Sequence, residues 1–140
     1  MSIKQLREET TKQKGLNIAF PLRTGLAGAF ETNKTTLDAV KDDLRILLLT
    51  NHGDRLIYGD FGANLRGLLF ENMSQDFETR IQDSIVSAVE KWMPFVTVKD
   101  IQVKTGQTDL SLGSNETRIK VFFSVNNSNL EDVIEVRMKV

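Results

Sequence analysis

The spacing of apolar positions changes once along this chain, from a helical period to a strand period. Between residues 36 and 49 the apolar residues recur three or four positions apart, after a Thr35 or Thr36 cap and with Asp38 in the first turn. A second stripe with the same spacing runs from an expected cap at Ser74 to Trp92. These two segments are predicted to be amphipathic helices.

Beyond Pro94 the apolar residues alternate with polar ones, which is the period of a strand. The segments 96–103, 117–125 and 133–140 are predicted to be strands. The apolar phase switches between Val98 and Ile101, and this predicts a bulge near Lys99 and Asp100. Helices followed by a run of strands indicate an α+β fold, with two main amphipathic helices packed on a mostly antiparallel or mixed sheet.

The remaining segments have weaker patterns. Residues 17–22 alternate but contain Pro21, so they predict a weak strand that ends there. Residues 23–34 have glycines and no period and are expected to form a loop, and residues 64–70 a short helix. Residues 1–14 read as a polar tail, and residues 15–140 are expected to form one domain.

Composition excludes several kinds of partner. The net charge is −1, with 18 basic and 19 acidic residues, so no broad positive field is expected to attract nucleic acid. No apolar run approaches the roughly 18 residues that span a membrane. The absence of cysteine excludes disulfides and thiolate metal sites, and it is compatible with a reducing cytoplasm.

Candidate catalytic residues lack supporting motifs. His52, the single histidine, lies near Asp54 in a loop that ends a helix, but no nucleophile motif accompanies it. A glycosidase needs one carboxyl group with a raised pKa and one ionised partner. The acids considered for such a pair are better explained as helix-start charge or surface polarity; they are Asp60, Glu71, Asp76 and Glu90. We predict no catalytic residue, no metal site and no cofactor.

The last predicted strand alternates up to the final residue, and its apolar positions are Ile134, Val136, Met138 and Val140. Natural proteins seldom leave an apolar strand edge uncovered, so a neighbouring protein could add a strand there. The same alternation also suits a strand in the middle of a sheet. The pattern leaves these two alternatives open.

One block of motifs resembles a known family. A helix ends in a Leu-Leu-Leu-Thr turn at Thr50, a Gly-Asp-Arg step follows at residues 53–55, then an Asp-Phe-Gly turn at residues 60–62, and then Leu68, Leu69 and Phe70. With the second helix and the proline after it, this order resembles the baseplate wedge and sheath-initiator family of contractile-tailed phages. A counterpart of that family occurs in type VI secretion baseplates.

The resemblance implies a structural protein of the virion tail baseplate whose partners are baseplate wedge proteins and the tail sheath protein. The tail tube or hub is a further partner that the resemblance leaves open. The C-terminal strands would be sheath-like and would nucleate sheath polymerisation by strand sharing through Ile134, Val136, Met138 and Val140. The partner-docking residues that the resemblance implies are Asp54, Arg55, Asp60, Phe61 and Gly62, together with Met93, Pro94 and Phe95.

Two positions depart from the family pattern. Gly59 stands where the family commonly has a proline, and Met93-Pro94-Phe95 replaces a Glu-Pro-Arg motif. An ion pair made through that motif must be absent or replaced by an apolar contact of Met93 and Phe95. Asp54 and Arg55 either contact a partner or brace their own loop.

Two other functions compete with this hypothesis. Members of the family have often carried a lysozyme-like label, so a peptidoglycan hydrolase is the alternative. A stand-alone binding module is the weaker third hypothesis.

Overall fold

A computed structural model describes residues 16–25, 30–33, 35–71, 76–126 and 128–139. The chain divides into two compact units, Met1–Asp42 and Asp43–Val140, and helix α2 (Thr36–Leu49) contributes residues to both. The expected tail at residues 1–14 lies outside the described residues, and the expectation of one domain from residue 15 onward stays a prediction.

The first unit contains a small hairpin beside the start of α2. Strands β1 (Asn17–Ile18) and β2 (Thr32–Asn33) pair antiparallel, so the strand predicted before Pro21 is confirmed in its first residues. The prediction of an uninterrupted loop over residues 23–34 was wrong at β2, because two residues are too few to show a period. The predicted helix is confirmed, and the Asp38 amide donates to Thr35 Oγ1 at 3.2 Å.

A polar network ties the hairpin to the helix within this unit. The buried Asp42 carboxylate accepts the Phe20 amide at 2.9 Å and the Asn33 side-chain amide at 2.8 Å. Asn33 also donates to Asn17 Oδ1 at 2.8 Å. A buried carboxylate is tolerated when such donors surround it, so these bonds fix the hairpin on α2.

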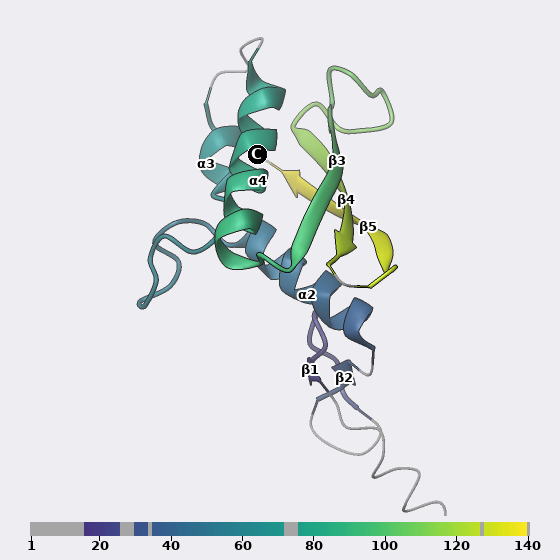
Figure 1. The fold of residues 1–140 in the computed structure, drawn as a ribbon. Helices are drawn as coiled ribbons and strands as arrows, with labels where there is room; N and C mark the ends of the chain where they lie inside the picture. Colours follow the sequence, from purple (N-terminus) through teal and green to yellow (C-terminus); the bar gives the residue numbers. More distant parts are fainter. Residues whose placement is uncertain (1–15, 26–29, 34, 72–75, 127, 140) are drawn as a thin grey trace, which may run out of the picture. The chain divides into compact units, whose positions relative to one another are not determined.

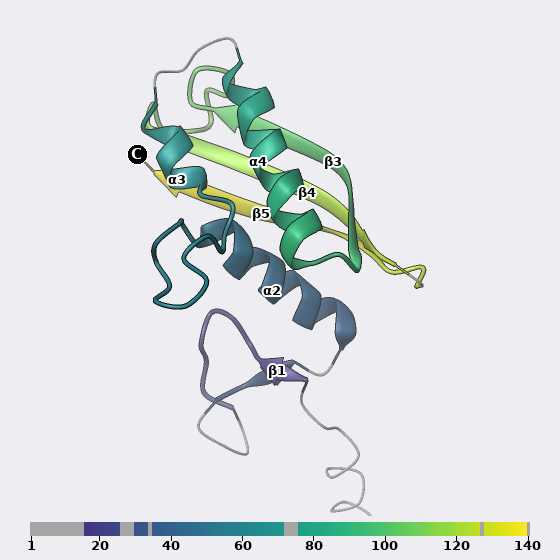
Figure 2. The ribbon, with the colours of Figure 1, turned by 60° about the vertical axis from the view of Figure 1, so that its left-hand side comes forward.

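The second unit is a three-stranded antiparallel sheet with helices on one face (Figures 1 and 2). The strand order is β3 (Val96–Thr105), β4 (Glu116–Val125), β5 (Glu131–Lys139), so β4 is central among the described strands. Helix α4 (Phe77–Trp92) packs against β3, and the short α3 (Leu65–Leu69) packs against α4. The α+β prediction is confirmed.

The strand register contains the predicted bulge. Val98 pairs with Phe123 and Asp100 pairs with Phe122, which leaves Lys99 as the extra residue. Because of this extra residue, Val98 and Ile101 both face the helices despite their odd spacing. β4 pairs with β5 without interruption from Glu116–Lys139 to Ser124–Glu131.

The core lies between the sheet and the helices. Its side chains come from every long element of the unit, and the largest with almost no exposure are Leu44, Leu47, Leu48, Leu65, Ile81, Ile85, Phe123, Ile119 and Ile134. The other face of the sheet carries mostly charged side chains. Several boundaries differ from the prediction: α4 begins at Phe77 with Asp76 at its N-cap, β3 continues to Thr105, β4 begins at Glu116 and β5 begins at Glu131. Ser74 lies outside the described residues.

Candidate interaction sites

The β5 edge offers main-chain groups to a neighbour. The Val125 amide donates to the Leu130 carbonyl at 3.0 Å, so this opposing pair is of the hydrogen-bonded type. Such pairs alternate along an uninterrupted antiparallel ladder, which directs the main chain of residues 132, 134, 136 and 138 toward β4. The main-chain groups of Val133, Glu135 and Arg137 therefore point away from the sheet. Among the described strands, β5 has β4 as its one neighbour.

Part of that edge is closed by the chain itself. The Val133 amide donates to the side chain of Asp132 at 2.7 Å. No comparable bond to the amides of Glu135 or Arg137 occurs in the described residues. The open part of the edge therefore centres on Glu135 and Arg137.

The side chains expected to share strands have a different position. Ile134 is 1% exposed and Val136 is 4% exposed, and both face the helices. Met138 is half-buried on the same side, and Val140 lies outside the described residues. These side chains anchor β5 in its own core, so the groups that face a neighbour are the main-chain atoms of the alternate residues.

Charged side chains cover the open face beside this edge. Glu135 lies 2.9 Å from Arg137 Nε, 3.4 Å from Arg118 Nε and 3.8 Å from Lys120 Nζ. The hydrogen bond from Arg137, with Arg118 and Lys120 nearby, lowers the pKa of the Glu135 carboxyl below its ordinary value. Lys139 likewise bonds Glu116 at 3.0 Å and lowers the pKa of that carboxyl. These charges discourage unspecific pairing with other sheet edges.

The loop between α2 and α3 is braced from within. The Arg55 guanidinium lies 3.6 Å from the centre of the Phe61 ring, and the edge of that ring meets Trp92 with centroids 5.2 Å apart. Asp60 forms an ion pair with Lys91 of α4, and the bond from Lys91 lowers the pKa of Asp60. The internal brace left open for Arg55 is therefore observed.

Two further positions fix the path of this loop. Asp54 Oδ2 accepts the Asn51 amide at 2.8 Å, so this carboxylate also braces its own loop. Gly62 has φ +110°, and a Cβ there would lie 2.1 Å from the Thr50 carbonyl oxygen. Glycine is required at this close approach. Of the residues predicted to dock on a partner, five therefore gather in one braced loop: Asp54, Arg55, Asp60, Phe61 and Gly62.

The tip of the loop exposes residues that the motif comparison did not single out. Leu56 is 107% exposed, and Ile57 and Tyr58 are also largely exposed. Tyr58 has φ 59°, and the centroids of the Tyr58 and Trp92 rings are 5.7 Å apart. This ring contact fixes the position of the apolar tip. Three consecutive apolar residues between two turn segments were the signal in the sequence. Such an exposed apolar group is typical of an interaction site.

The Met93-Pro94-Phe95 segment divides between core and surface. Met93 is 5% exposed, whereas Pro94 is exposed and Phe95 is 45% exposed. The Asn126 side chain donates to the Pro94 carbonyl at 3.2 Å, and the Asn126 amide donates to the Phe95 carbonyl at 2.8 Å. Pro94 and Phe95 are thus the side chains of this segment that a partner could contact.

The candidate catalytic groups are dispersed, except that His52 and Asp60 line one small cavity together with Ser84. His52 Nε2 lies 3.2 Å from the Gly62 carbonyl oxygen, and Glu71 forms an ion pair with Arg80. Asp76 is at the α4 N-cap and Glu90 is exposed on α4. Across the described ranges there is no cluster of three or more histidine, aspartate or glutamate residues that could hold a metal. None of the described helices is long and apolar enough to cross a membrane.

Comparison with known proteins supports the resemblance. A search of curated proteins found no match. The fold is similar to a chain in the anti-feeding prophage baseplate structure, with a TM-score of 0.65, 22% identity, and coverage of 80% of this chain and 86% of that chain. It is also similar to a presumed tail lysozyme from Geobacter sulfurreducens, with a TM-score of 0.66, 15% identity, and coverage of 79% and 96%.

The family model for baseplate wedge protein gp25 matches residues 34–130, which is more than half of the chain. That range includes α2, the braced loop, α3, α4 and the first two strands of the sheet. This chain belongs to the baseplate wedge protein gp25 family.

Proposed function

We propose that this protein is a structural, non-enzymatic subunit of a contractile tail baseplate that docks on wedge proteins and nucleates sheath polymerisation by strand sharing. Assembly would take place in the host cytoplasm and the protein would remain in the tail baseplate of the virion. The observation that carries the proposal is the edge position of β5, whose outward main-chain groups centre on Glu135 and Arg137.

The β5 edge suits a specific strand partner. An added strand binds through main-chain hydrogen bonds, which an open edge supplies without rearrangement of its own sheet. Ile134 and Val136 hold β5 rigidly in the core, so the edge is already in the bound conformation. The charges of Glu135, Arg137 and Lys139 would then select a partner strand of complementary charge.

Proline substitution at an outward-facing residue tests strand sharing. Arg137→Pro removes an amide that the fold does not use, whereas Arg137→Ala removes the same side chain and keeps the amide. We expect Arg137→Pro to block sheath polymerisation on assembled baseplates and Arg137→Ala to permit it, as seen by electron microscopy of tails.

A folding control accompanies this pair. Both variants should retain a cooperative thermal transition close to that of the parent protein, because neither loses a bond to β4. If Arg137→Pro folds and its tails carry normal sheaths, the main chain of β5 is not the shared edge.

For wedge docking, the braced loop is the favoured surface. Arg55, Phe61 and Asp60 hold the loop, and the exposed tip Leu56-Ile57-Tyr58 is available to enter an apolar pocket of a wedge protein. Phe95 would add a separate apolar contact.

Co-purification with wedge proteins tests the docking loop. The double variant Leu56→Asp, Ile57→Asp should lose the wedge proteins and keep its fold, because both side chains are exposed. Leu110→Asp, at another exposed leucine, is the matched control and should keep them. Equal recovery of wedge proteins with both variants would remove the loop tip from the interface.

The hydrolase alternative is kept because one similar structure is described as a presumed tail lysozyme. Hydrogen bonds lower the pKa values of the Asp60, Asp109, Glu116 and Glu135 carboxyl groups, which argues against each of these four as the general acid. A general acid for glycoside hydrolysis needs a raised pKa. Clearing of a peptidoglycan suspension that a single Asp or Glu substitution abolishes would favour the hydrolase.

A further inference from the structure

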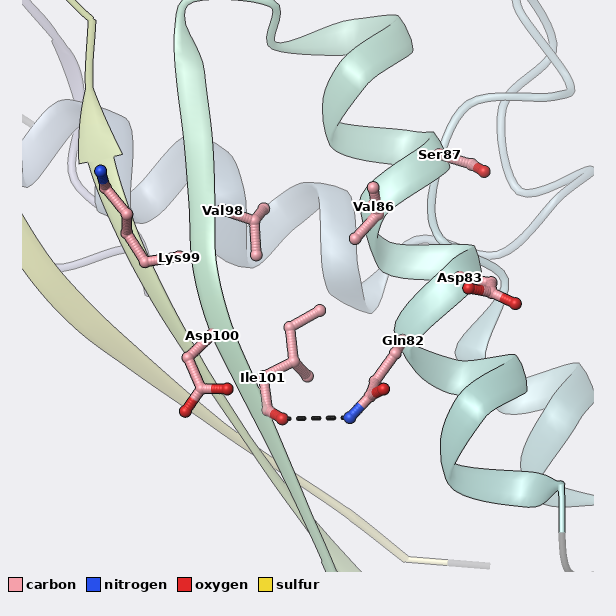
Figure 3. A pocket seen from close by; sticks show the side chains of 8 residues that line it. All are labelled: Gln82, Asp83, Val86, Ser87, Val98, Lys99, Asp100 and Ile101. Atoms are coloured by element: carbon pink, nitrogen blue, oxygen red, sulfur yellow. Dashed lines mark hydrogen bonds between the residues drawn. The ribbon is translucent and has the colours of Figure 1, made fainter.

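A groove runs between α4 and the outer edge of β3. This edge is at the opposite end of the strand order from β5. It consists of two adjoining cavities of about 450 Å³ and 370 Å³, both lined by Val86 and Val98. Figure 3 shows Gln82 and Val86 of α4 facing Val98 and Ile101 of β3 across the first cavity. The floor of the groove is apolar and its far wall is a strand edge.

The main chain of β3 is closed at both ends of this groove. The Val96 amide donates to the Met93 carbonyl at 2.9 Å, and the Thr105 amide donates to Thr108 Oγ1 at 2.9 Å. The Asp109 amide donates to the Thr105 carbonyl at 2.9 Å. These bonds confine any added strand to the segment between Val96 and Thr105.

In the middle of the groove the edge is open. The Gly106 amide donates to the Glu116 carbonyl at 3.0 Å, so alternation directs the main chain of Ile101 and Val103 away from β4. On the other side of the bulge, the bond from the Asn126 amide to the Phe95 carbonyl directs Val98 outward in the same way.

Ile101 and Val98 differ in whether their outward main-chain groups are already hydrogen-bonded. The Gln82 side chain donates to the Ile101 carbonyl at 3.2 Å, as the dashed line in Figure 3 marks. Within the described ranges, the outward main-chain groups of Val98 bond to no side chain or loop. Val98 is therefore the point at which an entering main chain would first bond.

The charges around the groove are mainly acidic. Asp83 and Asp100 line the first cavity and Glu90 lines the second, against the single base Lys99. Asp83, Asp100 and Glu90 are all exposed, so their charges are available to a ligand. A cationic segment complements this rim, and an acidic one would be repelled.

We infer that the groove between α4 and β3 binds an extended, lysine- or arginine-bearing segment of a partner protein as an added strand at Val98. Small apolar side chains of that segment would lie on Val86 and Val98, and its basic side chains, on the opposite face of the added strand, would reach Asp100. The entering main chain would replace the Gln82 amide on the Ile101 carbonyl. This site is separate from the β5 edge and does not depend on it.

Titration of the full-length protein with a defined peptide tests the inference. The probe is an end-blocked seven-residue peptide of alternating lysine and valine, followed by the amide resonances of the labelled protein. We expect saturable shifts at Val98 and Ile101 at millimolar peptide, and no binding of the peptide in which glutamate replaces lysine. Shifts at Glu135 and Arg137 instead, or no saturable shift, would overturn the inference.

Variants locate the binding to the groove. Val86→Arg places bulk and positive charge on the half-exposed floor and should abolish the shifts, whereas Val133→Arg adds the same group at the other edge and should leave them unchanged. The amide spectrum of each variant, recorded before peptide is added, shows whether the variant folds like the parent protein.

The variant Asp100→Asn should weaken binding about twofold, as expected for loss of one exposed ion pair. Unchanged affinity in this variant would contradict the charge argument. Because the test uses neither sheath nor wedge proteins, its failure leaves the proposed baseplate function intact.

Discussion

The two edges of the sheet are finished in different ways. At β3 the chain closes the two ends of the edge with Met93 and Thr108, and the Gln82 side chain occupies the Ile101 carbonyl, so the open part is a short segment at Val98. At β5 the described closure is the bond from the Val133 amide to Asp132, and charged side chains occupy the face beside it. The open part of β5 lies on an uninterrupted ladder, whereas that of β3 is interrupted by the bulge and by Gln82, and this contrast favours β5 as the edge that a sheath strand would share.

The largest expected effect separates the two sides of β5. Ile134→Ala should lower the free energy of unfolding by about 3 kcal/mol, because it leaves a cavity in the core. Val133→Ala, at the neighbouring residue that is 38% exposed, should cost under about 1 kcal/mol. Urea denaturation measures both. Equal losses in the free energy of unfolding would mean that β5 is buried on both faces. That result would contradict a solvent-exposed face beside an open edge.

An intermediate effect is expected at the β3 edge, where Gln82 bonds the main chain. Gln82→Ala removes the side-chain donor on the Ile101 carbonyl and should lower the free energy of unfolding by about 1 kcal/mol. Gln102→Ala is the matched control, since Gln102 bonds the exposed Asp100 at 3.3 Å on the open face. Urea denaturation in which both glutamine variants match the parent protein would show that α4 does not close this edge through Gln82.

The smallest effect concerns pH and the charges beside β5. The folded pKa of Glu135 is lower than its ordinary value of 4.5, so its contribution to stability is present above that value and is lost as pH falls through the folded pKa. The parent protein should be slightly more stable than Glu135→Gln at neutral pH, and the difference should vanish in acid. Thermal unfolding across pH measures this, and a difference that grows in acid would contradict the assignment.

The long elements of this fold were predictable because each carries its own period. The bulge could also be found, since the apolar phase on the two sides of Lys99 cannot be reconciled in a regular strand. The two-residue strand β2 could not, because its paired residues lie 14 and 16 positions away and leave no local pattern. Strand order was equally inaccessible, as the alternation of β5 suits an edge or a central position.

The docking residues show the same limit. Motifs identified the loop that contains Arg55 and Phe61, but the contact with Trp92 depends on how α4 packs, which no local spacing encodes. Met93 was expected at a partner surface and is 5% exposed; its backbone amide donates a hydrogen bond to the Val89 carbonyl at the end of α4. The three apolar residues at the tip, Leu56, Ile57 and Tyr58, were visible in the sequence, but their exposure was not, because it depends on how the loop is held against α4.

The most direct test of the account is the structure of the assembled baseplate with its first ring of sheath, determined by electron cryomicroscopy. The account predicts a sheath strand running beside β5 at a spacing of about 4.8 Å, hydrogen-bonded to the main chain of Glu135 and Arg137. A β5 edge that faces solvent, or that is covered by a helix of another subunit, would contradict strand sharing at this edge.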